Sequence, residues 1–333
     1  MDSIKKALVT LLRLGISVIL LILLFKFNKI DIHELASDIK SADKVFLTIG
    51  FLVFFLVYFL GFLRWHMLLK ATGINIPIKR LVISYSGGVF FSIFLPSTIG
   101  GDLVRTVDLA GHTKKTKEVI ATVFLDRLSG YIGLVIVVIF AFLFGKDLVR
   151  DKVVLFSVAV IIAILFFIML VLFNSFIYAR ISRFLSAPGA GKIKEMIKEL
   201  HHEIHIFRNR GKMVICNILL SVLVQFIAPI SAYFIALSLG IKTGFIYFLI
   251  FLPIIGAITL LPIAIGGLGL RESLFVFYFA KAGVVKQLSI AMSLLSFAFI
   301  VLYGALGGLI YVLTVHYRRV QCNASPQVYK KHT

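Results

Sequence analysis

Long uninterrupted apolar runs constrain this chain more than any other feature of its sequence. Each run is close to the roughly 20 residues that an α-helix needs to cross the hydrocarbon of a bilayer. The runs lie at about 8–27, 45–69, 119–145, 153–175, 213–239 and 288–316. A soluble helix or strand alternates apolar with polar positions so that one face meets water, and these runs do not. The chain is therefore predicted to be an all-α polytopic membrane protein.

Composition supports this class. Hydrophobic residues make up 60% of the chain, charged residues only 15%, and the mean hydropathy is +1.04, whereas a soluble domain averages about 25% charged residues. The two cysteines, Cys216 and Cys322, have neither disulfide-framework nor zinc-site spacing. No small-residue cleavage site precedes Lys26, so the first run is predicted to be a retained helix rather than a signal peptide.

The distribution of the net charge of +20 favours a membrane topology over nucleic-acid binding. Segments assigned to one side of the membrane carry 20 Lys and Arg against 5 Asp and Glu, and those on the other side carry 10 against 6. The first side receives residues 1–7, 70–80, 111–118, 176–212 and 317–333. An excess of Lys and Arg marks the cytoplasmic side. Both termini are therefore expected in the cytoplasm, with the basic segments facing anionic lipid of the cell membrane.

An internal repeat organises the chain. The segment from Leu95 to Arg105 aligns without a gap with the segment from Leu261 to Arg271, at an offset of 166 residues. The shared residues that are uncommon inside a membrane are Pro96, Gly100, Gly101 and Arg105 in the first copy and Pro262, Gly266, Gly267 and Arg271 in the second. The same offset carries the runs at 45–69 and 119–145 onto later runs, which predicts a duplicated fold.

The repeat is predicted to be inverted. Pro and Gly-Gly interrupt two further apolar regions, at about 81–110 and 244–280, and we expect these to form re-entrant or broken helical hairpins. From the distribution of Lys and Arg, the first hairpin is predicted to enter from and return to the cytoplasm, and the second to enter from and return to the outside. An inverted structural repeat with about six spanning helices and two hairpins is therefore predicted, with a substrate site near the midplane. The expected boundaries are a single transmembrane domain over 1–317, repeat 1 at about 8–145, repeat 2 at about 153–316, a cytoplasmic amphipathic linker at about 176–212 and a basic cytoplasmic tail at 318–333.

The repeated motif has the parts of an anion-binding site. Pro stops a helix, and Gly-Gly permits left-handed backbone or the close approach of another segment. A helix that restarts after the glycines directs free N–H groups at an anion, and Arg105 or Arg271 adds a fork suited to phosphate. The alternative is that Pro and Gly only kink and pack two helices, with Arg at their interface.

Other charged residues lie at membrane depth. Asp126 and Arg127 fall near the cytoplasmic end of their run, and Asp126 is expected to partner Arg105 or Arg271, while Arg127 lines the interior or snorkels to the interface. The halves differ in charge, because Asp102 aligns with Leu268 and Glu272 with Thr106. Glu272 is open to two roles, proton coupling or a structural ion pair.

Several remaining polar residues are expected to be structural. Arg64, Trp65 and His66 are predicted to anchor a helix end at the membrane interface. Gln225 and Pro229 are expected to mark a kink that faces the bundle interior. His201, His202 and His205 favour an amphipathic helix on the anionic inner leaflet over a metal site.

At these residues the chain resembles the lysylphosphatidylglycerol synthase transmembrane-region family, which includes the flippase domain of the multiple peptide resistance factor. The matching stretches are Leu95 to Arg105, Phe124 to Leu128 and Gly266 to Glu272, and the resemblance covers about 10–315. It implies translocation of lipids or service to lipid and polyprenol pathways. Only a basic tail follows residue 316, so this chain alone is not expected to synthesise lysylphosphatidylglycerol.

The leading prediction is a translocator, or flippase, that moves an anionic phospholipid or lipid-linked head group across the cytoplasmic membrane between the two hairpins. No enzymatic activity, cofactor, metal or nucleic-acid partner is expected, and lipid-facing helices leave room for a homodimer. Two alternatives stay open: a membrane-embedded transferase acting on a lipid phosphate, and a transporter of a small soluble anion or a scaffold.

Overall fold

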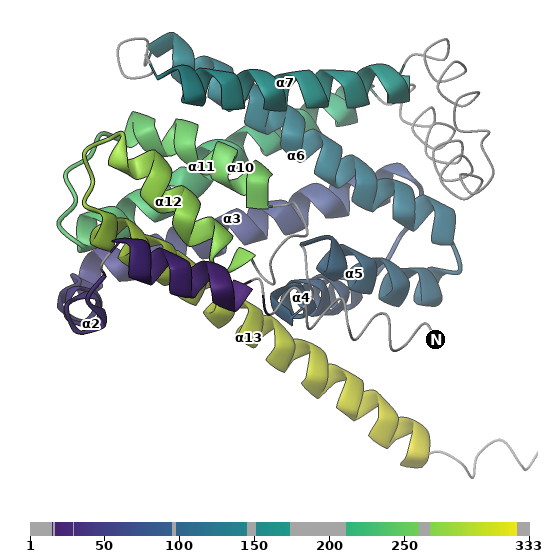
Figure 1. Ribbon diagram of the computed structural model, residues 1–333. Helices are drawn as coiled ribbons and strands as arrows, with labels where there is room; N and C mark the ends of the chain where they lie inside the picture. Colours follow the sequence, from purple (N-terminus) through teal and green to yellow (C-terminus); the bar gives the residue numbers. More distant parts are fainter. Residues whose placement is uncertain are drawn as a thin grey trace, which may run out of the picture.

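Every regular element that the structure describes is a helix. The computed structural model describes residues 15, 17–28, 30–94, 98–144, 151–173, 211–259 and 267–324, and no strand occurs in these ranges (Figure 1). After an apolar helix over Ser17–Asn28, the helices are α2 (Ile32–Ser41), α3 (Lys44–Ala71), α4 (Ile78–Phe94), α5 (Thr98–Thr113), α6 (Thr116–Phe144), α7 (Lys152–Phe173), α10 (Gly211–Ser238), α11 (Phe245–Thr259), α12 (Leu270–Ala280) and α13 (Lys286–Ala324).

Four helices, α3, α6, α10 and α13, are long and apolar enough to cross a membrane. They confirm the predicted runs at 45–69, 119–145, 213–239 and 288–316 as long apolar helices. The runs at 8–27 and 153–175 overlap the Ser17–Asn28 helix and α7, respectively. Many large apolar side chains of α3, among them Leu52 and Phe59, are exposed, as expected where a helix faces lipid rather than a protein core.

The order of helices recurs along the chain. Shifting α3, α4, α5 and α6 by the 166-residue offset of the sequence motif brings them onto α10, α11, α12 and α13. The ends agree within one residue for two pairs: α3 shifts to 210–237, where α10 is Gly211–Ser238, and α4 shifts to 244–260, where α11 is Phe245–Thr259. We name α4 and α5 the first hairpin and α11 and α12 the second hairpin.

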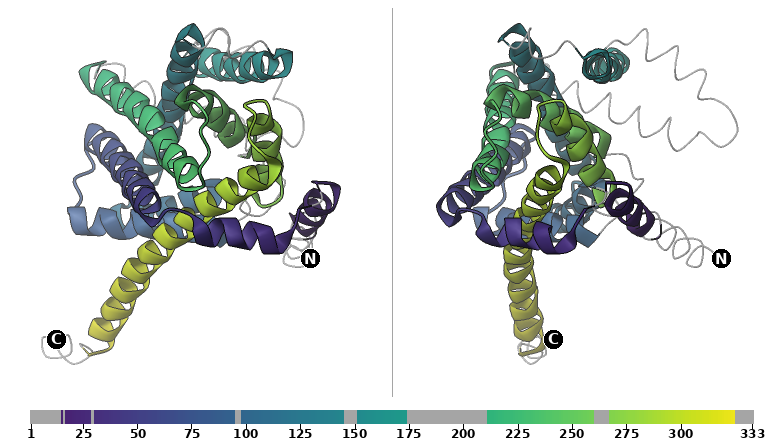
Figure 2. Two further views of the ribbon diagram at one scale, coloured as in Figure 1. Left: turned by 90° about the vertical axis from the view of Figure 1, so that its left-hand side faces the viewer. Right: turned by 60° about the vertical axis from the view of Figure 1, so that its left-hand side comes forward.

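The two halves interlock through their hairpins. The helix α4 packs both on α5 and on α13, while α3 lies along α10, and α6 contacts α10 and α11 (Figures 1 and 2). Glycines permit the contact of α4 with α13: a Cβ at Gly307 would lie 2.9 Å from the Ser86 carbonyl oxygen, and one at Gly308 would lie 2.3 Å from the Phe90 ring. The first hairpin is therefore supported by the last helix of the second half.

The two Gly-Gly motifs adopt different backbones. The helix α5 begins at Thr98, so Gly100 and Gly101 lie inside its first turn, and the prediction that a helix restarts after these glycines is wrong for the first copy. Here the glycine serves close approach, because a Cβ at Gly101 would lie 2.3 Å from the Gly88 carbonyl oxygen of α4. In the second copy α12 does begin after the glycines, at Leu270, and Gly267 has a left-handed φ of +74°.

Several predicted features lie outside the described residues or extend beyond their expected bounds. Pro96, Pro262, Gly266 and the histidines of the 176–212 linker lie outside the described ranges. The helix α13 continues to Ala324 and so includes the first residues of the predicted tail. It extends well beyond the other helices (Figure 2).

Candidate functional site

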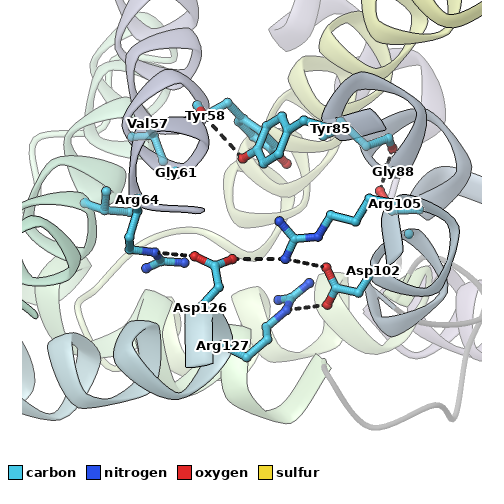
Figure 3. Close-up of a pocket in the computed structure, with 14 residues that line it drawn as sticks. Val57, Tyr58, Gly61, Arg64, Tyr85, Gly88, Asp102, Arg105, Asp126 and Arg127 are labelled. Atoms are coloured by element: carbon cyan, nitrogen blue, oxygen red, sulfur yellow. Dashed lines mark hydrogen bonds and ion pairs between the residues drawn. The ribbon is translucent and has the colours of Figure 1, made fainter. Parts of the chain in front are cut away.

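A cavity of about 290 Å³ lies between α3, the first hairpin and α6, with one wall residue from α10 (Figure 3). Its charged lining comes from α3, α5 and α6 and consists of Arg64, Asp102, Arg105, Asp126 and Arg127. We name these five side chains the charge network.

The charge network is a continuous chain of alternating charges. Arg64 Nε donates to Asp126 Oδ1 at 2.7 Å, and Arg105 Nη2 donates to Asp126 Oδ2 at 3.0 Å. The same Arg105 nitrogen is 2.9 Å from Asp102 Oδ1, and Arg127 Nε donates to Asp102 Oδ2 at 2.6 Å (Figure 3). Each carboxylate is thus shared by two guanidinium groups, and Arg105 lies at the centre of the chain.

Helix geometry explains how these side chains meet. Asp102 and Arg105 are three residues apart on α5, a spacing that places them on one helix face. Asp126 and Arg127 are adjacent on α6 and therefore point in different directions, so Asp126 reaches Arg64 and Arg105 while Arg127 reaches Asp102. The glycines hold α5 close to α4, and α5 also packs on α6.

Aromatic side chains hold the central guanidinium. Arg105 lies 4.6 Å from the centre of the Trp65 ring and 5.8 Å from that of Tyr85, distances typical of cation–π interactions. Trp65 is fully buried, and its Nε1 donates to Thr122 Oγ1 at 3.3 Å. Among the described side chains, Arg105 Nε is one of three buried polar atoms that lack a hydrogen-bond partner. The Arg105 guanidinium therefore retains an unused donor.

Burial makes the charge balance of the network important. The side chains of Arg105 and Asp126 are each 6% exposed, whereas that of Arg127 is 37% exposed. Removing a charge from water is costly unless an opposite charge compensates it. Three arginines and two aspartates leave one excess positive charge in this group of five. The arrangement favours an anion, and Arg127 is the most exposed side chain of the network.

The structure brings together Asp102, Arg105, Asp126 and Arg127, all of which the sequence singled out, and places Gly101 in the cavity wall. It also adds Arg64 and Trp65, for which the prediction of an interface anchor is wrong because both side chains are buried inside the bundle. The sequence held no clear signal against the anchor, because Arg64 lies about five residues before the end of its apolar run, a depth from which an arginine can snorkel to the interface.

The second copy of the motif forms a separate cluster. Arg271 Nη2 donates to Glu272 Oε1 at 2.6 Å, and Ser293 Oγ lies 3.1 Å from both Arg271 Nε and Glu272 Oε1. The Gly269 N–H donates to Glu272 Oε2 at 2.6 Å, so the carboxylate also caps the first turn of α12. Glu272 is fully buried, and Arg271 does not line the cavity of the charge network. The structure therefore does not bring Arg271 or Glu272 next to Arg105.

The two residues predicted to mark a kink in α10 face the interior of the bundle. Gln225 Nε2 donates to the Gly130 carbonyl oxygen of α6 at 3.1 Å, and Pro229 is buried within α10. Within the described ranges, no group of His, Cys, Asp and Glu side chains has the make-up of a metal site. The polar interior of the described bundle is thus composed of arginines, aspartates, one glutamate and uncharged hydrogen-bonding groups.

Comparison with known proteins assigns the chain to a family. Residues 10–308 match the family model described as the lysylphosphatidylglycerol synthase TM region. A UPF0104 membrane protein of Pyrococcus horikoshii is 24% identical over 306 residues, covering 86% of this chain and 90% of that protein. A UPF0104 membrane protein of Methanothermobacter thermautotrophicus is 25% identical over 286 residues, covering 78% and 82% of the two chains. Because the family model covers most of its length, this chain is a membrane protein that belongs to the lysylphosphatidylglycerol synthase TM region family.

Proposed function

We propose that this protein moves the anionic head group of a membrane lipid across the bilayer, with the charge network as the head-group site. The observation that carries the proposal is the buried group of three arginines and two aspartates that lines a cavity inside a multi-pass membrane protein. Ionisable groups at such depth are expensive and commonly mark a transport pathway.

Binding in this site is an exchange of ion pairs. A lipid phosphate that approaches Arg105 and Arg127 competes with Asp102 for their donors, and it also finds the unused Arg105 Nε. Arginine suits this role because its planar fork binds phosphate through paired hydrogen bonds. The displaced Asp102 is 13% exposed, more than Asp126, and is therefore the easier carboxylate to release. The acyl chains stay in the bilayer while the head group enters the cavity.

The proposal includes an inverted repeat in the cell membrane. Six crossings, two re-entrant hairpins open to opposite sides and two cytoplasmic termini account for the excess of Lys and Arg in one set of segments. The recurrence of four helices at one sequence offset supports the repeat. The site proposed from the structure is nevertheless asymmetric, because it uses the first hairpin and leaves Arg271 outside.

Translocation in proteoliposomes tests the proposal. Trace fluorescent anionic phospholipid is reconstituted with the wild type and with Arg105→Gln, and movement between leaflets is followed by quenching of the outer label. We expect translocation by the variant to be at least about 100-fold slower, because two charge-assisted hydrogen bonds from Arg105 to the head group, at about 1.5–3 kcal/mol each, are lost. Arg80→Gln is the matched control, since Arg80 is a buried arginine of the same hairpin that pairs with Asp108 outside the cavity.

Two outcomes would contradict the proposal. Unchanged lipid movement by Arg105→Gln, at an equal amount of folded protein, would remove the charge network from the pathway. Uptake of inorganic phosphate or sulfate by the wild type without lipid movement would instead favour a transporter of a small soluble anion.

A further inference from the structure

Head-group binding affects the two aspartates of the charge network differently. Asp102 has two counter-ions, Arg105 Nη2 at 2.9 Å and Arg127 Nε at 2.6 Å, and both belong to arginines that the head group contacts in the proposed function. Asp126 also pairs with Arg64 Nε, at 2.7 Å, and a head group at Arg105 and Arg127 does not compete for this partner. Binding therefore leaves Asp102, rather than Asp126, without a counter-ion.

Packing keeps Asp102 beside the bound phosphate. The preceding residue, Gly101, lies so close to α4 that a Cβ there would be 2.3 Å from the Gly88 carbonyl oxygen. The aspartate side chain is short, and that of Asp102 is only 13% exposed. Figure 3 shows its carboxylate between the guanidinium groups of Arg105 and Arg127. A phosphate that takes over these donors is therefore a close neighbour of the carboxylate that it displaces.

Two buried anions at one site favour the uptake of a proton. Like charges that share a site make it unfavourable for both groups to stay ionised, and burial acts in the same direction. A phosphodiester is a much stronger acid than a carboxyl group, so the proton binds to the carboxylate of Asp102. The protonated carboxyl can then donate its O–H to a phosphate oxygen, and a charge-assisted hydrogen bond replaces the repulsion.

The other groups around Asp102 are poorer proton acceptors. Among the described residues, the charged or titratable side chains that line this cavity or interact electrostatically with Asp102 are Arg105 of α5, Asp126, Arg127 and Tyr131 of α6, Tyr85 of α4, and Tyr58 and Arg64 of α3. Near neutral pH an ordinary arginine is already protonated and an ordinary tyrosine is neutral. Asp126 keeps Arg64 as its counter-ion, which leaves Asp102 as the acceptor.

We propose that Asp102 takes up one proton from water when a lipid phosphate binds to Arg105 and Arg127, so that the protein transports the head group together with a proton. This inference rests on the proposed function and adds a coupled substrate to it. A monoanionic phosphate and a proton together carry no net charge, so the charge network has one excess positive charge both when empty and when loaded. When the head group leaves, Asp102 releases the proton to water and re-forms both ion pairs.

Binding measured against pH tests the coupling. Trp65, the single tryptophan of the chain, lies 4.6 Å from the Arg105 guanidinium and reports binding by its fluorescence. The probe is short-chain phosphatidylmethanol, whose single negative charge is constant near neutral pH. We expect its affinity for the purified full-length protein in detergent to fall about tenfold per unit of rising pH around neutrality, with uptake of about one proton per bound lipid. Calorimetry in two buffers of different ionisation enthalpy counts that proton.

Two aspartates of α5 provide a variant and its matched control. Asp102→Asn mimics the protonated carboxyl, so we expect it to bind the probe without proton uptake and with an affinity that does not change with pH. Asp108→Asn is the control, because Asp108 pairs with Arg80 and Ser84 outside the cavity, and it should keep the pH dependence of the wild type. The proton count of the wild type tests the proposal without any variant.

A pH gradient across proteoliposomes tests transport itself. Because the head group and the proton move together, we expect the wild type to accumulate labelled phosphatidylmethanol in the leaflet on the alkaline side, about tenfold for a gradient of one pH unit. Asp102→Asn should equalise the two leaflets instead, and protein-free liposomes give the baseline.

The possible failures are distinguishable. Binding and lipid movement without proton uptake or a response to the gradient would overturn the coupling and leave the proposed function standing. Proton uptake that persists in Asp102→Asn and is lost in Asp126→Asn would overturn the assignment to Asp102. If the wild type neither binds nor moves the lipid at any pH, the coupling fails together with the head-group site on which it rests.

Discussion

The first and second hairpins start from one sequence pattern and use their arginine in opposite ways. In the first, Arg105 bridges two carboxylates that it shares with Arg64 and Arg127, and the group lines a cavity with one excess positive charge. In the second, Arg271 pairs with the adjacent Glu272 in a buried cluster. The comparison teaches that a repeat can preserve the helix order while the position of a single carboxylate decides whether an arginine is available to a ligand.

The largest expected difference between the two hairpins is the effect on lipid translocation of neutralising Arg271 or Arg105. We expect Arg271→Gln to keep lipid translocation within about threefold of the wild type, against the about 100-fold loss expected for Arg105→Gln. Both rates are measured in proteoliposomes at equal folded protein. An equal loss in the two variants would show that both hairpins hold the head group, as the sequence pattern predicts.

A large effect on stability is expected at Glu272. Glu272→Gln leaves Arg271 as a buried charge without a counter-ion, and breaking such a pair costs about 3–5 kcal/mol. Asp102→Asn should cost less, because Arg127, one of its two partners, has a side chain that is 37% exposed and can be solvated. Unfolding in detergent with a chemical denaturant measures both changes. A smaller loss of stability for Glu272→Gln than for Asp102→Asn would contradict the distinction between the buried Arg271–Glu272 pair and the more exposed charge network.

Glycines of α5 test the close packing of the first hairpin. Gly101→Ala places a Cβ 2.3 Å from the Gly88 carbonyl oxygen, which cannot move as a side chain can. We expect a loss of about 1–3 kcal/mol from overpacking, together with slower translocation. Gly111→Ala on the same helix is the control, since a Cβ there has no neighbour within 4 Å. Equal stability of the two variants would argue against close α4–α5 contact.

The smallest effect is expected where α7 meets the end of the second hairpin. Asp151, just before α7, accepts from Lys281 and from the Val153 N–H, and these hydrogen bonds lower the pKa of its carboxyl below the usual 3.8. The contribution to stability is therefore complete at neutral pH and is lost as the pH falls below 3.8.

Asp151→Asn tests this contact, and we expect its melting temperature at pH 7 to fall by no more than about 2–4 °C. The difference in melting temperature between the variant and the wild type should disappear when the pH is below the lowered pKa of Asp151. A difference that persists below the lowered pKa would mean that Asp151 acts through its helix cap alone.

Much of the fold could be predicted from the sequence because lipid imposes simple rules. Apolar runs of membrane length identified α3, α6, α10 and α13, and Pro with Gly-Gly located the two hairpins. Asp102, Arg105, Asp126 and Arg127 could also be selected, since a charged residue at membrane depth is rare.

Three features could not be predicted, for physical reasons. The contact of Arg64 with Asp126 joins positions 62 residues apart, and a single sequence does not show which face of each helix meets the other. The separation of Arg271 from Arg105 likewise depends on tertiary packing. Helical continuity through Gly100 and Gly101 was also missed, because glycine permits a helix as readily as a break when a neighbouring backbone packs against it.

The interlocking of α4 with α13 has a consequence for the order in which the protein is made. All five residues of the charge network lie between positions 64 and 127, so their ion pairs can form once α6 has left the ribosome. The glycine-lined partner of α4 is α13, which is synthesised after every other helix of the described residues. The ion pairs of the site can therefore form before the helix that packs against the first hairpin has been synthesised. Ribosome-bound intermediates that end before α13 carry the complete charge network on a hairpin that lacks this packing partner.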